Sequence, residues 1–437
     1  MRLFNTLLFV LFALSANAAD GTVGTVSVQK GNNVSVNGEA PLSLTLDGKD
    51  HQSCQFLSKR APDESHELTW KEVTTTRGGE LAEILGDQLR SVDSLVVKGY
   101  VNDKDFHAMW DASLYGYLSV INLKNAVLEN NAVPDTAFFH ENEQYEGSSH
   151  EIFYYIGLRK IILPEGLEKI GEGAFYQASA LRQVNFPSTL RYIGDFAFNA
   201  TKLEMNQLVI PEGVEEINQY AFAFCRKLKA QVTLPSTIKK IGEWAFYGCP
   251  ITSINLPEGL ESLGSLAFWD CDLREVSIPS SCHEFNEGWQ FGFNRNLEKM
   301  HLPEGMTEIP DHFAVDCFRL REVNFPHTLK HIGEKAFSLC ISLKNVDLPL
   351  GMQSLGEEAF SELEALEQIV FPASMKSLGK NSCSYWKNIK RIYCAAIEPP
   401  VCDPTDGGVF SGFDFPDGLN TPVVYIPKGT INKYKDT

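Results

Sequence analysis

Ten prolines recur at intervals of 22 to 24 residues along the chain. They are Pro164, Pro187, Pro211, Pro235, Pro257, Pro279, Pro303, Pro326, Pro349 and Pro372. A repeat this short cannot bury a core of its own and must stack on its neighbours. The period therefore predicts a solenoid built from rungs of about 23 residues.

A short apolar motif precedes each proline. Apolar residues stand one and three positions before it, as Leu163 and Ile161 do before Pro164. Alternation over so few residues is the period of a strand with one buried face. Proline lacks an N–H group and cannot continue the hydrogen-bonded ladder. Each proline therefore predicts the end of a short strand.

Two further regularities follow each proline. The seventh residue after it is glycine or asparagine in nine of the ten copies, Pro310 being the exception, which predicts a left-handed backbone there. An Ala-Phe pair comes next, and we expect its phenylalanines to stack from rung to rung as the spine of the core. They are Phe175, Phe198, Phe222, Phe246, Phe268, Phe337 and Phe360. The repeat after Pro279 lacks this pair, and the next one reverses it as Phe313-Ala314.

The second residue after each proline alternates between glycine and a hydroxyl residue. In order these are Gly166, Thr189, Gly213, Thr237, Gly259, Ser281, Gly305, Thr328, Gly351 and Ser374. The repeating sequence unit is therefore a pair of rungs, and we expect an alternating turn geometry on one edge of the solenoid.

The repeated phrase resembles the BspA-like leucine-rich repeat family. Residues 320–340, LREVNFPHTLKHIGEKAFSLC, are a complete copy, and the resemblance extends over roughly residues 78–435. It implies a curved α/β repeat solenoid of short strands and irregular or short helical turns, capped at both ends. It also implies a bacterial cell-surface or secreted protein, since the better-known members are adhesins that bind host proteins. Fold transfers more strongly than function in such a comparison.

The N-terminus has the features of a secretory signal. Arg2 is followed by an apolar run over residues 7–14 and by Ala16-Asn17-Ala18, a small-residue cleavage site. No cysteine follows that site, so the sequence does not predict a lipoprotein, and no later stretch is apolar enough to span a bilayer. We predict an exported protein that is secreted, periplasmic or held at the cell surface.

The chain divides into five predicted parts. These are the signal peptide (1–18), a small β-rich segment (19–77), atypical capping repeats (78–157), regular repeats (158–393) and a C-terminal capping unit (394–437). Within the capping repeats, helical spacing appears over residues 81–89 and strand patterns appear at 94–98 and 118–123.

Composition and motifs weigh against several functions. The net charge of −18 disfavours nucleic acid and anionic membranes as partners. His327 and His331 are four residues apart but lie outside any predicted helix, so they do not form a helical zinc pair. No phosphate-binding glycine loop and no carboxylate pair with catalytic spacing occur. We predict a non-enzymatic protein without cofactor or metal; an enzyme site within residues 20–157 is the remaining alternative.

Five cysteines share one repeat position, fourteen residues after the proline. They are Cys225, Cys249, Cys271, Cys317 and Cys340. Rungs about 4.8 Å apart would permit disulfides by distance, but equivalent side chains point in parallel. A buried ladder of free thiols acting as apolar filler is therefore favoured over disulfides. Cys383, Cys394 and Cys402 lie close together near the end of the chain, where one disulfide could form.

Two surfaces are candidates for binding. The first is the exposed strand face, rich in amides and hydroxyls, with Asn185, Thr233, Asn255, Ser277, His301 and Asn324. The second is a set of aromatic residues nine or twelve positions after the prolines, namely Phe196, Tyr220, Trp244, Tyr247, Trp269 and Phe291. A solvated sheet face and aromatics packed between turns are the structural alternatives. We predict macromolecular binding, either adhesion or protein–protein interaction at the bacterial surface, with a glycan-binding accessory protein as the alternative.

Overall fold

A computed structural model describes the backbone of four strands between residues 24 and 50, and backbone and side chains for residues 69–139, 156–402, 408–411 and 421–435. The predicted signal peptide lies outside the described residues. Contacts group the chain into two compact units. Unit 1 comprises residues 1–130, 136–164 and 175–185, and unit 2 comprises residues 131–135, 165–174 and 186–437.

Unit 1 contains two sheets. The first has the order β2-β1-β3-β4, in which β1 and β2 form an antiparallel hairpin. Its strands are β1 (Gly24–Gln29), β2 (Asn33–Gly38), β3 (Leu44–Leu46) and β4 (Lys49–Asp50). The second sheet is parallel, with the order β11-β9-β7-β6-β5. Its strands are β5 (Trp70–Thr75), β6 (Ser94–Val101), β7 (Val120–Leu128), β9 (Lys160–Ile162) and β11 (Gln183–Val184).

Helices accompany the parallel sheet of unit 1. The helical spacing at residues 81–89 forms α2 (Leu81–Leu85) and the 3-10 helix η2 (Gly86–Arg90); a second 3-10 turn, η3 (Glu129–Asn131), follows β7. The sequence reasoning missed α3 (Asp103–Tyr115), which begins with a capping box between Asn102 and Asp105. Asp105 is buried and accepts hydrogen bonds from the backbone N–H groups of Gly79 and Leu81. α3, the longest helix in the described part of the chain, has 13 residues, too few to cross a bilayer.

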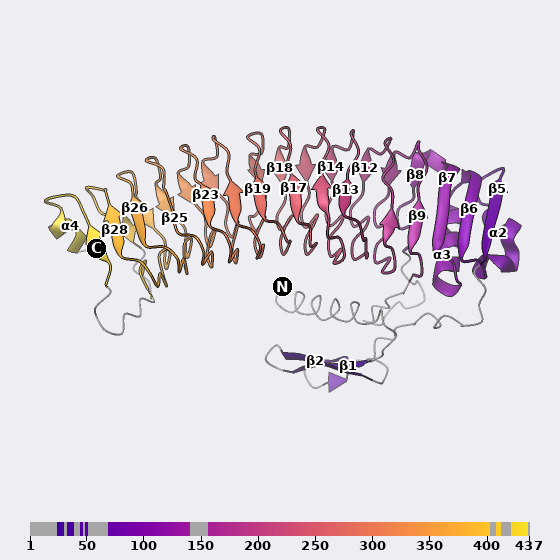
Figure 1. Ribbon diagram of the computed structural model, residues 1–437, viewed down its shortest axis with the longest axis horizontal. Coiled ribbons are helices and arrows are strands. Elements are labelled where there is room, and N and C mark those ends of the chain that lie inside the picture. The colour runs from indigo at the N-terminus through magenta and orange to yellow at the C-terminus, as the bar shows by residue number, and fades with distance from the viewer. Residues whose placement is uncertain are drawn as a thin grey trace. The chain divides into compact units, whose positions relative to one another are not determined.

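Unit 2 is a parallel β-solenoid, which confirms the fold predicted from the prolines (Figure 1). One side carries short strands that end just before seven of the prolines, Pro349 having no strand before it, and two more strands beyond the last of the ten prolines. They are β13 (Gln207–Val209), β15 (Gln231–Thr233), β17 (Ser253–Asn255), β19 (Glu275–Ser277), β21 (Lys299–His301), β23 (Glu322–Asn324), β26 (Gln368–Phe371), β28 (Arg391–Cys394) and β30 (Val423–Tyr425). Turns connect the strands, where short helices had also been expected, and a described helix, α4 (Ile431–Lys435), follows β30.

A second, unpredicted strand of two residues lies five and six positions after each of the ten prolines, and one more strand of this kind lies on either side of that series. These strands pair in parallel from rung to rung in two sheets. They are β8 (Ala132–Val133), β10 (Lys169–Ile170), β12 (Tyr192–Ile193), β14 (Glu216–Ile217), β16 (Lys240–Ile241), β18 (Ser262–Leu263), β20 (Glu284–Phe285), β22 (Glu308–Ile309), β24 (His331–Ile332), β25 (Ser354–Leu355), β27 (Ser377–Leu378) and β29 (Val401–Cys402). Two residues are too few to show a strand period, so this strand could not be predicted from the sequence.

The glycines seven positions after the prolines allow neighbouring rungs to approach closely and do not have the predicted left-handed backbone. Gly194 and Gly242 do not have a positive φ. A Cβ on Gly194 would lie 2.7 Å from the backbone nitrogen of Glu172, and one on Gly242 would lie 2.8 Å from that of Gln219. These glycines allow close approach of neighbouring rungs, so the prediction of a left-handed backbone at this position was wrong.

The left-handed backbone occurs instead nine and thirteen residues after the prolines. Phe196, Tyr220 and Trp244 have φ values of 56°, 55° and 58°. This conformation turns their N–H groups toward the next rung, where Tyr220 donates to the carbonyl of Glu243 at 2.9 Å. Each rung is therefore hydrogen-bonded to the next rung at three places: at its two strands and at the turn that carries these left-handed residues. The bonds at the turn satisfy backbone groups that would otherwise be unpaired.

The phenylalanine row forms the predicted spine of the core. Phe222, Phe246 and Phe268 are fully buried, and their rings stack with centroids 5.3 and 5.5 Å apart. Phe291 continues the stack 5.6 Å beyond Phe268, and Phe313 then packs edge-on against it. Phe291 was predicted on the surface, which was wrong. One extra residue near Gly288 moves it into the position that phenylalanine holds in the other rungs.

The alternation of glycine and hydroxyl residues joins rungs in pairs. Gly213 has a φ of 97°, and its N–H group donates to the hydroxyl of Thr237, which donates in turn to the carbonyl of Val214, both at 2.9 Å. The pairs 166/189, 259/281 and 305/328 repeat this arrangement. In the fifth pair Gly351 lacks the positive φ, and the Ser374 hydroxyl donates to the carbonyl of Met352. Four of the five pairs therefore have the alternating turn geometry expected from the sequence.

Candidate binding surfaces

The first candidate surface is the aromatic edge, which we define as Phe196, Tyr220, Trp244, Tyr247, Trp269, Trp289, Phe293 and His312. All of these side chains are partly exposed, and they lie along the turns of the left-handed residues in unit 2. Bulky residues are strained in that conformation by roughly 1 to 2 kcal/mol, which glycine or asparagine avoids. Gly173 and Asn381 hold the same position in other rungs, so aromatic residues are not required by the turn.

Four of the predicted aromatics form one stack. Phe196 lies on Tyr220 with ring centroids 4.7 Å apart and planes within 7°, and Tyr220 lies on Trp244 at 5.3 Å and 15°. Tyr247 packs against Trp244 at 4.4 Å, and burial raises the pKa of its hydroxyl to about 12. The ring faces are turned toward one another, so the partly exposed side chains present mainly ring edges to solvent.

Trp269 belongs to a second stack that the sequence reasoning did not find. It packs against Phe293 at 4.5 Å and Trp289 at 5.2 Å, and Trp289 stacks on His312 at 3.6 Å. The extra residue near Gly288 hid Trp289 and Phe293 from counting along the repeat; realigning that rung on Phe291 would have shown them. The His312 Nδ1 atom is buried without a hydrogen-bond partner in the described structure, and burial lowers the pKa of the ring.

The second candidate surface is the strand face, where all six predicted residues lie. Asn185, Thr233, Asn255, Ser277 and Asn324 are exposed, and His301 is partly exposed. The amide of Asn185 is already bonded to the backbone N–H and carbonyl of Leu163, and Asn324 binds Leu302 in the same way. The His301 Nε2 atom lies 3.2 Å from the carboxylate of Glu275. Much of this face is therefore committed to contacts within the protein.

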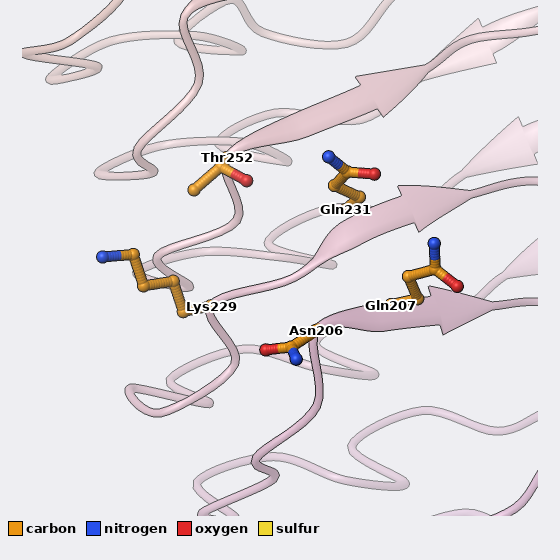
Figure 2. A pocket seen from close by; sticks show the side chains of 5 residues that line it. All are labelled: Asn206, Gln207, Lys229, Gln231 and Thr252. Carbon is orange, nitrogen blue, oxygen red and sulfur yellow. The ribbon is translucent and has the colours of Figure 1, made fainter.

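A hollow interrupts the strand face at the start of β13, β15 and β17. It has a volume of about 680 Å³ and is lined by Asn206, Gln207, Lys229, Gln231 and Thr252 (Figure 2). Gln207 and Gln231 are register partners on neighbouring strands. Lys229 and Thr252 come from the chain segments that lead into β15 and β17. The sequence predicts an amide-rich strand face but does not distinguish Gln207 and Gln231 from its other residues.

Comparison with known proteins identifies the repeat. The family model of the BspA type leucine-rich repeat region matches in six copies at residues 148–231, 229–333 and 312–397, together more than half of the chain. The chain belongs to the BspA-type leucine-rich repeat family. No curated protein matches it.

Solved structures of leucine-rich repeat proteins are similar to this BspA-type chain at low identity. One from Bacteroides ovatus is 19% identical over 85% of this chain and 93% of its own, with a TM-score of 0.45. A leucine-rich cell surface protein from Faecalibacterium prausnitzii is 18% identical over 74% and 82%, with a TM-score of 0.35. The pneumococcal vaccine antigen PcpA is 17% identical over 94% and 95%, with a TM-score of 0.36.

The cysteines of the BspA-type repeat form the predicted ladder of buried free thiols. The thiol of Cys249 donates to the carbonyl of Phe222 at 2.9 Å, and the thiol of Cys317 to that of Phe291 at 3.3 Å. Asn294 donates to the carbonyl of Phe268 from the same repeat position. The position therefore supplies a hydrogen-bond donor, and the prediction of a purely apolar filler was incomplete.

Burial also disfavours the reactive thiolate form at Cys249 and Cys317. Burial raises the pKa of Cys317 to about 12 and that of Cys249 well above the ordinary value, and only the thiolate is nucleophilic. Cys383, Cys394 and Cys402 are free as well, so the structure contains no disulfide among these three residues. Within the described residues no group of three or more His, Cys, Asp and Glu side chains is arranged to hold a metal ion.

Proposed function

We propose that this chain is an exported bacterial surface protein that binds another protein through the aromatic edge, and that it acts as an adhesin and not as an enzyme. Tryptophan, tyrosine and arginine dominate the energetics of protein interfaces. The aromatic edge combines three tryptophans and two tyrosines. Arg226 lies over Phe224 and Arg295 over Phe293, each about 5.5 to 5.8 Å from the ring centroid, beside the two stacks. This concentration of interface residues is the observation that carries the proposal.

The stacking favours a protein over a glycan as the partner of this edge. Carbohydrate recognition by aromatic residues uses an accessible ring face. Here Tyr220 lies between the stacked rings of Phe196 and Trp244, and one face of Trp289 is covered by His312. Ring edges and the adjacent guanidinium groups suit the carbonyl groups, carboxylates and apolar side chains of a protein surface.

The size of the edge also suits a protein partner. Rungs lie about 4.8 Å apart, so the positions from Phe196 to His312 extend over five rung spacings, roughly 24 Å. A standard interface buries about 800 Å² on each side, which an edge of this length and its flanking turns can supply.

A binding panel tests the proposal. The full mature chain is immobilised and probed with host matrix proteins and with polysaccharides. Trp244→Ala and Trp269→Ala are expected to weaken the protein partner at least about tenfold, which is the effect of an interface hot spot. Tyr192→Ala removes an aromatic residue that is 42% exposed on β12, outside the edge, and is expected to leave the affinity unchanged.

Circular dichroism of each variant separates lost binding from lost folding. Because Trp244 also contacts two rings, Trp244→Phe provides a variant that keeps the stack. If every partner found by the panel binds both alanine variants as tightly as the wild type while the variants remain folded, the aromatic edge is not the interface.

A further inference from the structure

The hollow on the strand face is lined by polar groups that have few partners within the protein. In the part of the chain that the structure describes, neither the Lys229 ammonium nor the amides of Asn206, Gln207 and Gln231 make a hydrogen bond or an ion pair. Thr252 only donates a long hydrogen bond of 3.4 Å to the carbonyl of Ala230, which leaves its oxygen able to accept. The hollow is thus lined by polar groups that remain available to a ligand.

Some polar side chains in later rungs of the same face have partners within the protein. Asn324 is bonded to the backbone of Leu302, and Lys299 pairs with Glu322 at 3.3 Å. Lys390, directly before β28, pairs with Glu367 at 2.8 Å. At the hollow, by contrast with these residues, four uncommitted polar side chains and the Thr252 hydroxyl border one concave surface.

We propose that the hollow binds an acidic carbohydrate, a chain of sugars that carries hexuronate carboxylates. Each sugar hydroxyl needs both a donor and an acceptor, and a side-chain amide supplies both. Gln207 and Gln231 present such amides on adjacent strands, about 4.8 Å apart, so that they can contact neighbouring groups of one extended ligand. The site is separate from the aromatic edge and does not rest on the function proposed for it.

The lining residues decide between ligand classes. A peptide or protein would require an apolar pocket for an anchoring side chain, and none of the five lining residues is apolar. None is acidic either, although the chain carries a net charge of −18. Lys229 is the only cation among them, and an ammonium group pairs with a carboxylate as a point charge. One positive charge among neutral amides therefore selects a sugar with one carboxylate and not a densely sulfated chain.

Calorimetric titration of the full mature chain tests this site. The probes are oligosaccharides of hyaluronan, unsulfated chondroitin and polygalacturonate, each compared with its carboxyl-reduced, neutral form. We expect at least one acidic probe to bind, more tightly than its reduced form, and to weaken as sodium chloride is raised. Lys229→Met is expected to lower that affinity about tenfold and to remove the preference for the acidic form.

Three variants make the test specific. Lys330→Met removes an exposed lysine elsewhere and gives the same change in net charge, so it should bind as the wild type does. Gln231→Glu places a carboxylate in the hollow and should abolish binding of the acidic form. Trp244→Ala, at the aromatic edge, should leave the glycan affinity unchanged, which keeps a failure of this proposal distinct from a failure of the protein-binding proposal.

Three results would overturn the proposal. The first is the absence of binding to all three acidic probes at millimolar concentration. The second is binding that Lys229→Met and Gln231→Glu leave unchanged. The third is a protein ligand whose binding is lost in Lys229→Met when no acidic probe binds, which would assign the hollow to a protein.

Discussion

Replacing Phe246 by alanine removes one ring from the buried phenylalanine stack. The side chain is fully buried, with Phe222 at 5.3 Å on one side and Phe268 at 5.5 Å on the other. The flanking rings belong to different rungs, whose backbones are held by hydrogen bonds on three sides. They cannot close together to fill the space, so the variant is expected to contain a cavity.

The magnitude follows from the buried area and the cavity. A phenylalanine buries about 150 to 250 Å², worth roughly 4 to 6 kcal/mol at 25 cal/mol per Å², of which alanine retains the Cβ contribution. The retained Cβ makes the loss of stability smaller, whereas the two missing ring contacts and the incomplete relaxation of the cavity make it larger. We expect Phe246→Ala to reduce the free energy of unfolding by about 4 kcal/mol, within the 3 to 5 kcal/mol typical of buried phenylalanine.

Urea unfolding followed by circular dichroism measures this loss. The slope of the transition must be unchanged for the free energies to be compared, because repeat arrays can lose two-state behaviour. Val209→Ala, at a residue 54% exposed on β13, is the control and is expected to change stability by less than about 0.5 kcal/mol. A loss below about 1 kcal/mol for Phe246→Ala, with an unchanged slope, would refute the assignment of this ring to the spine of the core.

Two further predictions concern the turns. Thr237→Val keeps the shape of the side chain but removes the hydroxyl between Gly213 and Val214, and it should lower unfolding stability by about 1 to 3 kcal/mol in urea melts; an unchanged midpoint would show that the paired turns do not depend on this bridge. Burial lowers the pKa of His312 in the folded chain, although Glu334 lies nearby. Below about pH 6.5 this histidine is therefore protonated more readily in the unfolded chain than in the folded chain, which favours unfolding. Stability should then fall more between pH 7.5 and 5.5 in the wild type than in His312→Phe, and equal losses would contradict this reasoning.

Much of the rung was predictable because its signals lie within one repeat. The proline and the apolar pair before it predict the first strand, and the Ala-Phe pair predicts a buried ring at Phe246. The alternation of Gly213 with Thr237 predicted paired turns, which the hydrogen bonds between rungs explain. Counting along the repeat failed where one residue is added, so Phe291 was placed on the surface and Trp289 was overlooked.

The candidate surfaces show the limit of that reasoning. The position of Trp244 in its rung predicted that it would lie near Tyr220, but not that their faces would stack and thereby favour a protein over a glycan. Asn185 and Gln231 have the same kind of side chain on the same face. Only the structure shows that the first is bonded to the backbone of Leu163 while the second lines a hollow.

The period of about 23 residues and its apolar positions were enough to predict a solenoid of stacked rungs, because a rung of this length cannot bury a core alone. The contacts between rungs explain why particular residue types recur at a given position of the rung. Gly194 permits close approach of the neighbouring rung, and the thiol of Cys249 donates to the rung before it. Such roles depend on distances between residues more than twenty positions apart, which a one-dimensional pattern does not contain.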